Sequence, residues 1–98
     1  MSELGFEWDA PKEARNRRKH GVSFDEAETV FSDTHALLIH DPEHSATEDR
    51  FILLGLSAEF RILVVVHTYR ESQRVIRIVS ARKATGEERD AYNRRWRE

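Results

Sequence analysis

Residues 60–84 constrain the fold of this 98-residue chain more than any other stretch. They read FRILVVVHTYRESQRVIRIVSARKA, in which two apolar runs, residues 62–66 and 75–79, flank a short polar segment. Both runs are rich in β-branched residues, which favour strands, and residues 71–73 have the polar character of a turn. The stretch therefore predicts a β-hairpin at or near the centre of a sheet.

The length of the turn decides which side chains of the hairpin share a face, because a slip of one residue moves every side chain to the opposite face. An odd turn over residues 71–73 pairs His67 with Arg77. An even turn leaves Ile76 beside His67 instead. The odd turn separates apolar from mixed residues better, so we expect one packed face and one half-polar face that carries His67, Arg77 and Lys83.

Capping and turn signals predict the remaining elements. Asp9 and Gly21 are placed to begin and end a helix over residues 11–20, and capping boxes at residues 23–26 and 85–88 open two more helices. Strands are expected over residues 5–9, 36–40 and 50–56, in addition to the hairpin. The order β-α-α-β-β-β-β-α predicts a single α+β domain over residues 1–98. It consists of an antiparallel sheet of about four to five strands, packed against two N-terminal helices, with a C-terminal helix. The helices are expected on one side of the sheet.

Composition narrows the class of protein. The chain has no cysteine, which excludes disulfides and thiolate metal sites, and no apolar run approaches the roughly 20 residues that span a bilayer. We therefore expect a cytoplasmic protein without membrane association. The net charge of −2 is unevenly spread: residues 1–60 carry 6 Lys/Arg and 13 Asp/Glu, whereas residues 61–98 carry 10 and 5. Clustered cations favour a phosphate-bearing ligand, although most charge runs are solvated surface.

Several motifs together resemble one family. They are WD-x-x-K from Trp8, R-K-H-G-V-S-F from Arg18, the strand RFILLGLS from Arg50, and I-x-S-A-R-K-A from Ile78. Over about residues 6–92 the chain resembles the BrnT family of bacterial toxins. Each motif alone is weak, but their combination is distinctive.

The resemblance implies a RelE-like fold and a ribonuclease activity that stops translation under stress. It also implies a BrnA-like antitoxin from the same operon, a small DNA-binding protein with a ribbon-helix-helix that covers the active face of the toxin. RNA is then the substrate, and DNA is contacted only indirectly, through the antitoxin. No cofactor is expected.

RNA cleavage without a metal needs a base for the 2′-OH, an acid for the leaving oxygen, and cations for the charge that develops on phosphorus. Histidine suits the first two roles and arginine the third. We therefore predict a catalytic group and a substrate-binding group, and no metal site. The catalytic candidates are His67, Arg77, Arg82 and Lys83, and the substrate-binding candidates are Lys19, His20, Arg61 and Arg74.

Each candidate also has a structural interpretation. His67 is equally consistent with a hydrogen-bonded strand histidine beside a core, and Arg77 with a salt bridge to a glutamate of a neighbouring element. Of the two cations that close the last strand, alternation favours Lys83 over Arg82 for the half-polar face. The alternative function is a non-catalytic binding module whose basic sheet face holds an acidic protein or nucleic acid. A metal-dependent nuclease is a weaker alternative, because the histidines lack metal-ligand spacing.

Overall fold

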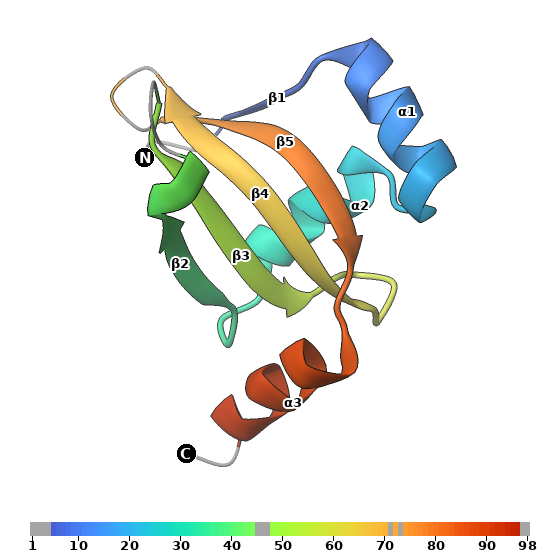
Figure 1. The fold of residues 1–98 in the computed structure, drawn as a ribbon, viewed down its shortest axis with the longest axis vertical. Coiled ribbons are helices and arrows are strands. Elements are labelled where there is room, and N and C mark those ends of the chain that lie inside the picture. The colour runs from blue at the N-terminus through green and yellow to red at the C-terminus, as the bar shows by residue number, and fades with distance from the viewer. Residues whose placement is uncertain (1–4, 45–47, 71, 73, 97–98) are drawn as a thin grey trace.

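The computed structural model describes residues 5–44, 48–70, 72 and 74–96. The predicted order of elements is confirmed, with two short 3-10 helices (η1 and η2) in addition (Figure 1). The elements are β1 (Gly5–Glu7), α1 (Ala10–His20), α2 (Phe24–Thr29), η1 (Val30–Ser32), β2 (Leu37–Asp41), η2 (Pro42–His44), β3 (Arg50–Leu56), β4 (Ile62–Arg70), β5 (Val75–Lys83) and α3 (Gly86–Arg95).

The five strands form one sheet in the order β1-β5-β4-β3-β2. The pairs β2–β3, β3–β4 and β4–β5 are antiparallel, but β1 pairs with β5 in parallel. The sheet is therefore mixed, and the all-antiparallel prediction is wrong. The first strand reaches the far edge of the sheet, beside the last strand, which no signal local to either segment reveals. The central position predicted for the hairpin is confirmed, because β4 is the middle strand.

The register of the hairpin differs from the prediction. Arg70 pairs with Val75, so the turn has an even length, and Thr68 is opposite Arg77. Because neighbouring residues of a strand point to opposite faces, His67 and Arg77 lie on opposite faces of the sheet. Their predicted pairing is therefore wrong.

A β-bulge lies in the middle of the hairpin. Val66 pairs with Ser80 and His67 pairs with Ile78, which leaves Val79 as an extra, unpaired residue of β5. A bulge of this kind reverses the alternation of the strand that carries it. On the side of the bulge away from the turn, side chains share faces as the odd turn predicts. Between the bulge and the turn, they share faces as an even turn requires.

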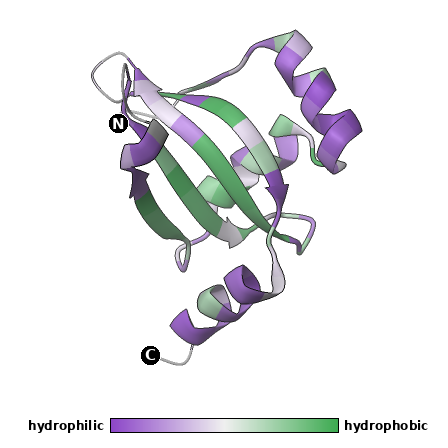
Figure 2. Cartoon of the chain, in the orientation of Figure 1, coloured by the Kyte–Doolittle hydropathy of each residue, from purple (hydrophilic) through white to green (hydrophobic). Residues whose placement is uncertain are grey.

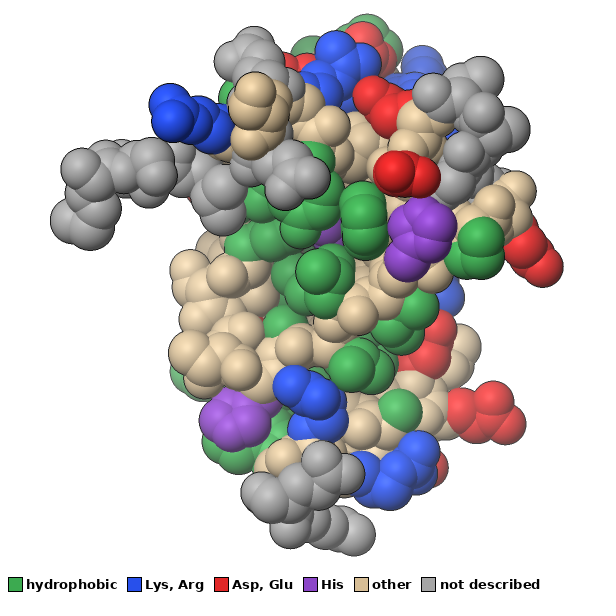
Figure 3. Space-filling view, turned by 90° about the vertical axis from the view of Figure 1, so that its left-hand side faces the viewer, with side chains coloured by type: hydrophobic (Ala, Val, Ile, Leu, Met, Phe, Trp, Pro, Cys, Tyr) green, Lys and Arg blue, Asp and Glu red, His purple; other side chains and the backbone are tan. Residues whose placement is uncertain are grey.

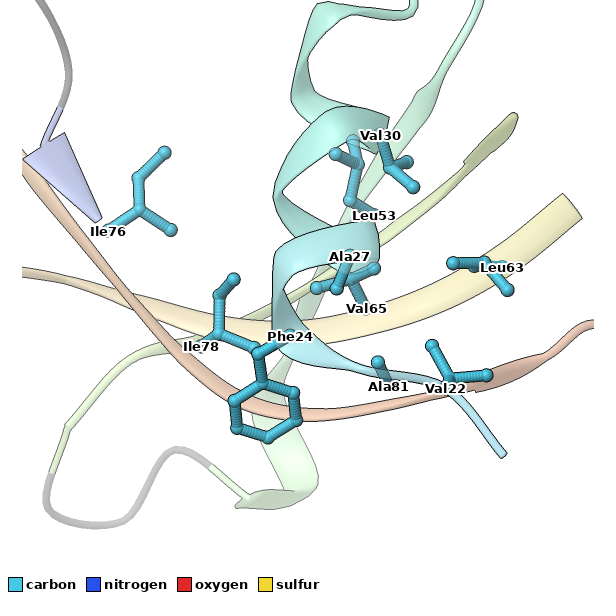
Figure 4. Packing of buried hydrophobic residues seen from close by; sticks show 10 residues of the cluster. All are labelled: Val22, Phe24, Ala27, Val30, Leu53, Leu63, Val65, Ile76, Ile78 and Ala81. Atoms are coloured by element: carbon cyan, nitrogen blue, oxygen red, sulfur yellow. The ribbon is translucent and has the colours of Figure 1, made fainter. Parts of the chain in front are cut away.

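The sheet face that carries His67 is the packed one, not the half-polar one that was predicted. Helix α2 lies over this face, and α1 contacts its β5 edge. Figure 4 shows the apolar side chains that fill the space between the helix and the strands. They are Val22, Phe24, Ala27, Val30, Leu53, Leu63, Val65, Ile76, Ile78 and Ala81.

Helix α3 packs on the opposite face, so the prediction that all helices lie on one side is wrong. Ala91 and Tyr92 of α3 contact apolar residues of β3 and β4, among them Leu54 and Val64. Apolar residues concentrate in the strands, whereas α1 and α3 are largely hydrophilic (Figure 2). Helix α3 therefore covers part of the second face, whose uncovered part carries both apolar side chains, such as Ile39, and the polar side chains of β5.

The predicted helix ends are largely confirmed. The Asp9 side chain accepts a hydrogen bond from the first turn of α1, and Gly21 ends the helix with φ of 69° in the left-handed region that favours glycine. Ser23 caps α2 by accepting from the amide of Glu26, and residues 85–88 form a complete capping box before α3.

Candidate functional site

Two arginines of β5 share the face of the sheet that α2 does not cover. Arg77 pairs with Thr68 of β4 and Arg82 pairs with Val64, and both partners point to that face. Arg70 lies on it as well, two residues beyond Thr68. We call this surface, with Thr68, Arg70, Arg77 and Arg82, the arginine face.

Arg77 is held by a carboxylate from the neighbouring strand. Its guanidinium donates to Glu7 of β1 at 2.7 Å, which is the salt bridge that the structural interpretation of Arg77 predicted. Arg70 approaches the same carboxylate at 3.9 Å and that of Glu48 at 3.8 Å. In all three pairs each side chain stays partly exposed to solvent, so the cations remain accessible.

Arg82 is held by a carboxylate from α3. Its two terminal nitrogens donate to the two oxygens of Glu88 at 2.8 and 2.9 Å, a bidentate pair. The hydrogen bond raises the pKa of Arg82 and lowers the pKa of Glu88 to about 2. Both groups are therefore charged at any physiological pH.

A buried hydroxyl lies on the arginine face, opposite Arg77. Thr68 is 1% exposed, and its Oγ1 has no hydrogen-bond partner in the described part of the chain. A buried hydroxyl without a partner is costly, and such groups are rare in folded proteins. The arginine face thus combines paired cations with an unsatisfied donor.

His67 lies on the other side of the sheet and is fully buried. Its ring contacts Phe31, Phe51 and Tyr69, with centroid separations of 4.8, 6.1 and 5.2 Å. Its Nδ1 donates to the carbonyl oxygen of Val65, and its Nε2 accepts from the hydroxyl of Tyr69. Burial lowers its pKa to about 4, and the enclosed imidazole has no path to an RNA phosphate in this conformation.

Arg61, predicted to bind substrate, is engaged in a half-buried ion pair. Its guanidinium donates to both carboxylate oxygens of Glu26, which is 2% exposed, and to the carbonyl oxygen of Gly21. Ser57 also donates to Glu26, at 2.7 Å. Glu26 therefore serves this ion pair, and only the Ser23 half of the predicted capping box forms. The geometry favours a structural role for Arg61.

The remaining predicted cations lie away from the arginine face. Lys19 and His20 end α1, just before Gly21, and the exposed Arg74 lies in the hairpin turn. Lys83 is opposite Leu63, on the face that carries His67 and packs against α2, as alternation predicted. Arg77 does not share that face, because the even turn places it opposite Thr68. The structure places Arg77 and Arg82 on the arginine face, and His67 and Lys83 on the opposite face.

Comparison with known proteins identifies the family. Residues 8–88 match the model of the ribonuclease toxin, BrnT, of type II toxin–antitoxin systems. The chain belongs to the BrnT family. A toxin of this family is a ribonuclease, and its type II system includes an antitoxin protein.

A solved structure shows the same fold. The crystal structure of the Brucella abortus ribonuclease toxin BrnT, determined at 1.1 Å resolution, matches this toxin with a TM-score of 0.62 at 24% sequence identity. The match covers 84% of this chain and 97% of that chain. No curated protein matches the chain.

In the described part of the chain, a larger and a smaller cavity adjoin the sheet of this toxin. The larger, about 700 Å³, is lined by the carboxylates of Glu28 and Asp33 together with hydroxyl and apolar side chains, without any Lys or Arg, so it does not suit a phosphate. The smaller, about 260 Å³, lies between α3 and the sheet. Figure 3 faces the β2 edge and shows hydrophobic side chains down the middle of this surface, with charged groups above and below. The smaller cavity is lined by Leu37, Ile39, Ile52, Leu54, Val64, Arg82, Glu87, Glu88 and Ala91.

Sequence reasoning missed the carboxylates of the arginine face. Glu7 was not considered, because its contact with Arg77 depends on a parallel pairing across 70 residues. Glu88 was recognised only as a member of a capping box, although its spacing of six residues from Arg82 was a usable signal. In the described residues, no group of His, Asp or Glu side chains could hold a metal ion, and no helix is long and apolar enough to cross a membrane.

Proposed function

We propose that this toxin cleaves RNA on the arginine face without a metal ion, by attack of the 2′-OH on the adjacent phosphorus. The observation that carries the proposal is the placement of Arg77 and Arg82 on one partly exposed face of β5. Guanidinium groups bind phosphate oxygens in pairs and stabilise the extra charge on phosphorus in the transition state. The family supplies the ribonuclease activity, and this face supplies cations suited to it.

Proton transfer needs a second kind of group on the same face. The carboxylate of Glu7, 2.7 Å from Arg77, is the side chain that we assign to accept the proton of the 2′-OH as the bond from phosphorus to the 5′ oxygen breaks. Solvent water, which reaches this partly exposed face, supplies the proton that the leaving 5′ oxygen takes up. Glu88 is a poor base because its pKa is lowered to about 2. His67 has no place in this scheme, because it is buried on the opposite side of the sheet.

The consequences for the cell follow from this activity. We propose that RNA cleavage blocks translation and that a BrnA-like antitoxin covers the arginine face, with DNA bound by the antitoxin. An acidic antitoxin segment suits these cations and would associate faster at low salt. The RelE-like character of the fold and the cytoplasmic location stay predictions.

The proposal is tested with purified toxin that has been separated from its antitoxin. We expect it to cut RNA in the presence of EDTA and to leave a 2′,3′-cyclic phosphate or 3′-phosphate together with a 5′-hydroxyl. A requirement for a divalent cation, or products with a 5′-phosphate, would contradict the mechanism. If the toxin never cuts RNA, with or without ribosomes, the function is that of a binding module instead.

A further inference from the structure

We infer that Glu88 occupies the position of an RNA phosphate on Arg82, so that α3 competes with the substrate for this cation. The inference rests on the proposed function, since it assumes that RNA binds the arginine face. It assigns to Glu88 a role in setting the affinity for RNA, in addition to its role in the capping box.

The geometry of the pair is that of a phosphate site. Arg82 presents two nitrogens to two carboxylate oxygens, at 2.8 and 2.9 Å, and a phosphate offers two oxygens to the same fork. The side chains of Arg82 and Glu88 are 40% and 31% exposed, so an incoming anion can reach the guanidinium. A partly exposed pair of this kind contributes little to stability, which makes exchange of one anion for another feasible.

Release of Arg82 leaves the helix start intact. Glu88 also accepts a hydrogen bond from the amide of Thr85 at 2.8 Å, and the Thr85 side chain accepts from the amide of Glu88. This capping box involves no atom of Arg82. When a phosphate takes the place of Glu88 on Arg82, the Glu88 carboxylate therefore still has the Thr85 amide as a partner. The exchange is local and does not require α3 to unfold.

Helix α3 has other attachments to the rest of the toxin. The Tyr92 hydroxyl donates to Asp33 at 2.6 Å, and Arg95 donates to the carbonyl oxygen of His35 at 2.8 Å. Trp96, just after the helix, stacks on the His35 ring with a centroid separation of 3.7 Å. These contacts hold the C-terminal half of α3, so loss of the Glu88 pair is not expected to detach the helix.

The other cation of the site repeats the arrangement. Arg77 is held by Glu7 as Arg82 is held by Glu88, each by a carboxylate from a neighbouring element. Internal carboxylates thus neutralise the arginine face, which is consistent with a net charge of −2 in an RNA-cleaving protein. Substrate phosphates then bind by replacing these carboxylates rather than by filling vacant cation sites.

The variant Glu88→Gln tests the inference, because glutamine keeps the capping box but removes the charge that binds Arg82. Glu87→Gln is the matched control, since Glu87 is exposed, adjacent and absent from the Arg82 pair. Affinity is measured with a single-stranded 2′-O-methyl RNA oligonucleotide, which lacks the nucleophilic hydroxyl and is not cut. We expect Glu88→Gln to bind about 2- to 5-fold more tightly than Glu87→Gln, the factor that matches a partly exposed ion pair.

Dependence on Arg82 separates competition from a general effect of charge. In an Arg82→Gln background, the difference between Glu88→Gln and Glu87→Gln should disappear. Equal affinities of the two variants with Arg82 present, or weaker binding by Glu88→Gln, would overturn the inference and leave Glu88 as a structural anchor. Thermal melting confirms that each variant is folded.

The proposed function is judged separately. If the wild-type toxin neither binds the oligonucleotide nor cuts unmodified RNA, the proposed function fails. If the wild-type toxin binds and cuts RNA but the Glu88 and Glu87 variants behave alike, only the inference about Glu88 fails.

Discussion

Arg77 and Arg82 share one face of β5 although they are five positions apart in the chain, an odd number. In a regular strand an odd separation places two side chains on opposite faces. Here Val79 is an extra, unpaired residue between them, and the bulge restores a common face. The same bulge sends Lys83 to the side of α2. The cation pair of the site is therefore a product of one backbone irregularity.

The bulge leads to a prediction about activity. Replacing Arg77 or Arg82 with Ala removes a cation from the developing phosphorane, and each change should lower RNA cleavage by ~10²-fold or more. Lys83→Ala is the control, because Lys83 is the next residue along β5 but points to the other face. Cleavage rates on one RNA substrate give the comparison. Equal losses in Lys83→Ala and Arg82→Ala would mean that the arginine face is not the site.

The secondary structure was accessible from sequence because its signals are local. Asp9, Gly21 and Ser23 mark helix ends by their own backbone and side-chain preferences, and β-branched runs mark strands. The register of the sheet could not be predicted from sequence. Alternation shows which side chains share a face only where the two strands pair residue by residue without a bulge. The extra residue Val79 breaks that regularity without an unusual residue type. The parallel pairing of β1 with β5 is also invisible in either segment alone.

The candidate site was predictable only in part. Arg77 and Arg82 stood out as charges in an apolar strand, and both lie on the accessible face. His67 was singled out by residue type, but aromatic neighbours from η1, β3 and β4 enclose it, and these contacts arise only in the folded chain. Glu7 and Glu88 were missed because nothing in the sequence near them shows that each forms an ion pair with an arginine of another element.

The ion pair of Arg61 with Glu26 should affect stability rather than catalysis. Arg61→Ala leaves a carboxylate that is 2% exposed without its cation, and such a loss costs on the order of 3 kcal/mol of unfolding free energy. Urea denaturation measures the change, with the exposed Arg74→Ala as a control that should stay within about 0.5 kcal/mol of wild type. A stable Arg61→Ala variant with impaired RNA cleavage would instead favour the original substrate-binding assignment.

The pH dependence of the Arg61 variant has a defined sign. Arg61 lowers the pKa of Glu26 below 4.5, so the pair stabilises the fold above pH 4.5 and loses its effect as the pH falls and Glu26 takes up a proton. The difference in stability between wild type and Arg61→Ala should therefore shrink below pH 4.5. A difference that is constant from pH 7 to pH 3 would contradict the ion-pair account.

The Tyr92 hydroxyl should anchor α3 to the loop before β2. Tyr92→Phe removes a 2.6 Å hydrogen bond to Asp33, whose carboxylate keeps the amides of His35 and Leu56 as donors. Because a charged acceptor loses one partner, we expect a loss of about 1–2 kcal/mol in unfolding free energy. Asn93→Ala, an exposed change on the same helix, is the control. An unchanged midpoint of denaturation in Tyr92→Phe would show that α3 docks without this bond.

His67 should make the toxin sensitive to acid. Burial lowers its pKa from 6.5 to about 4, so the folded state favours the neutral imidazole. As the pH falls below 6.5, His67 takes up a proton in the unfolded chain but stays neutral in the folded protein, which favours unfolding. The stability that the neutral imidazole contributes is therefore lost as the pH falls from 6.5 to 4. The two pKa values correspond to ~3 kcal/mol in total, because one pKa unit is worth about 1.4 kcal/mol.

The variant His67→Phe isolates this contribution. Phenylalanine keeps an aromatic ring among Phe31, Phe51 and Tyr69 but does not titrate, so the loss of stability between pH 6.5 and 4 should be much smaller than in wild type. The variant removes the hydrogen bond from Tyr69, which lowers stability at every pH without changing this slope. Unfolding free energies from urea titrations at several pH values provide the measurement. Because the imidazole is sealed behind the sheet, a folded His67→Phe variant should also retain RNA cleavage. A well-folded variant that has lost cleavage would return His67 to the catalytic group and require the core to open during the reaction.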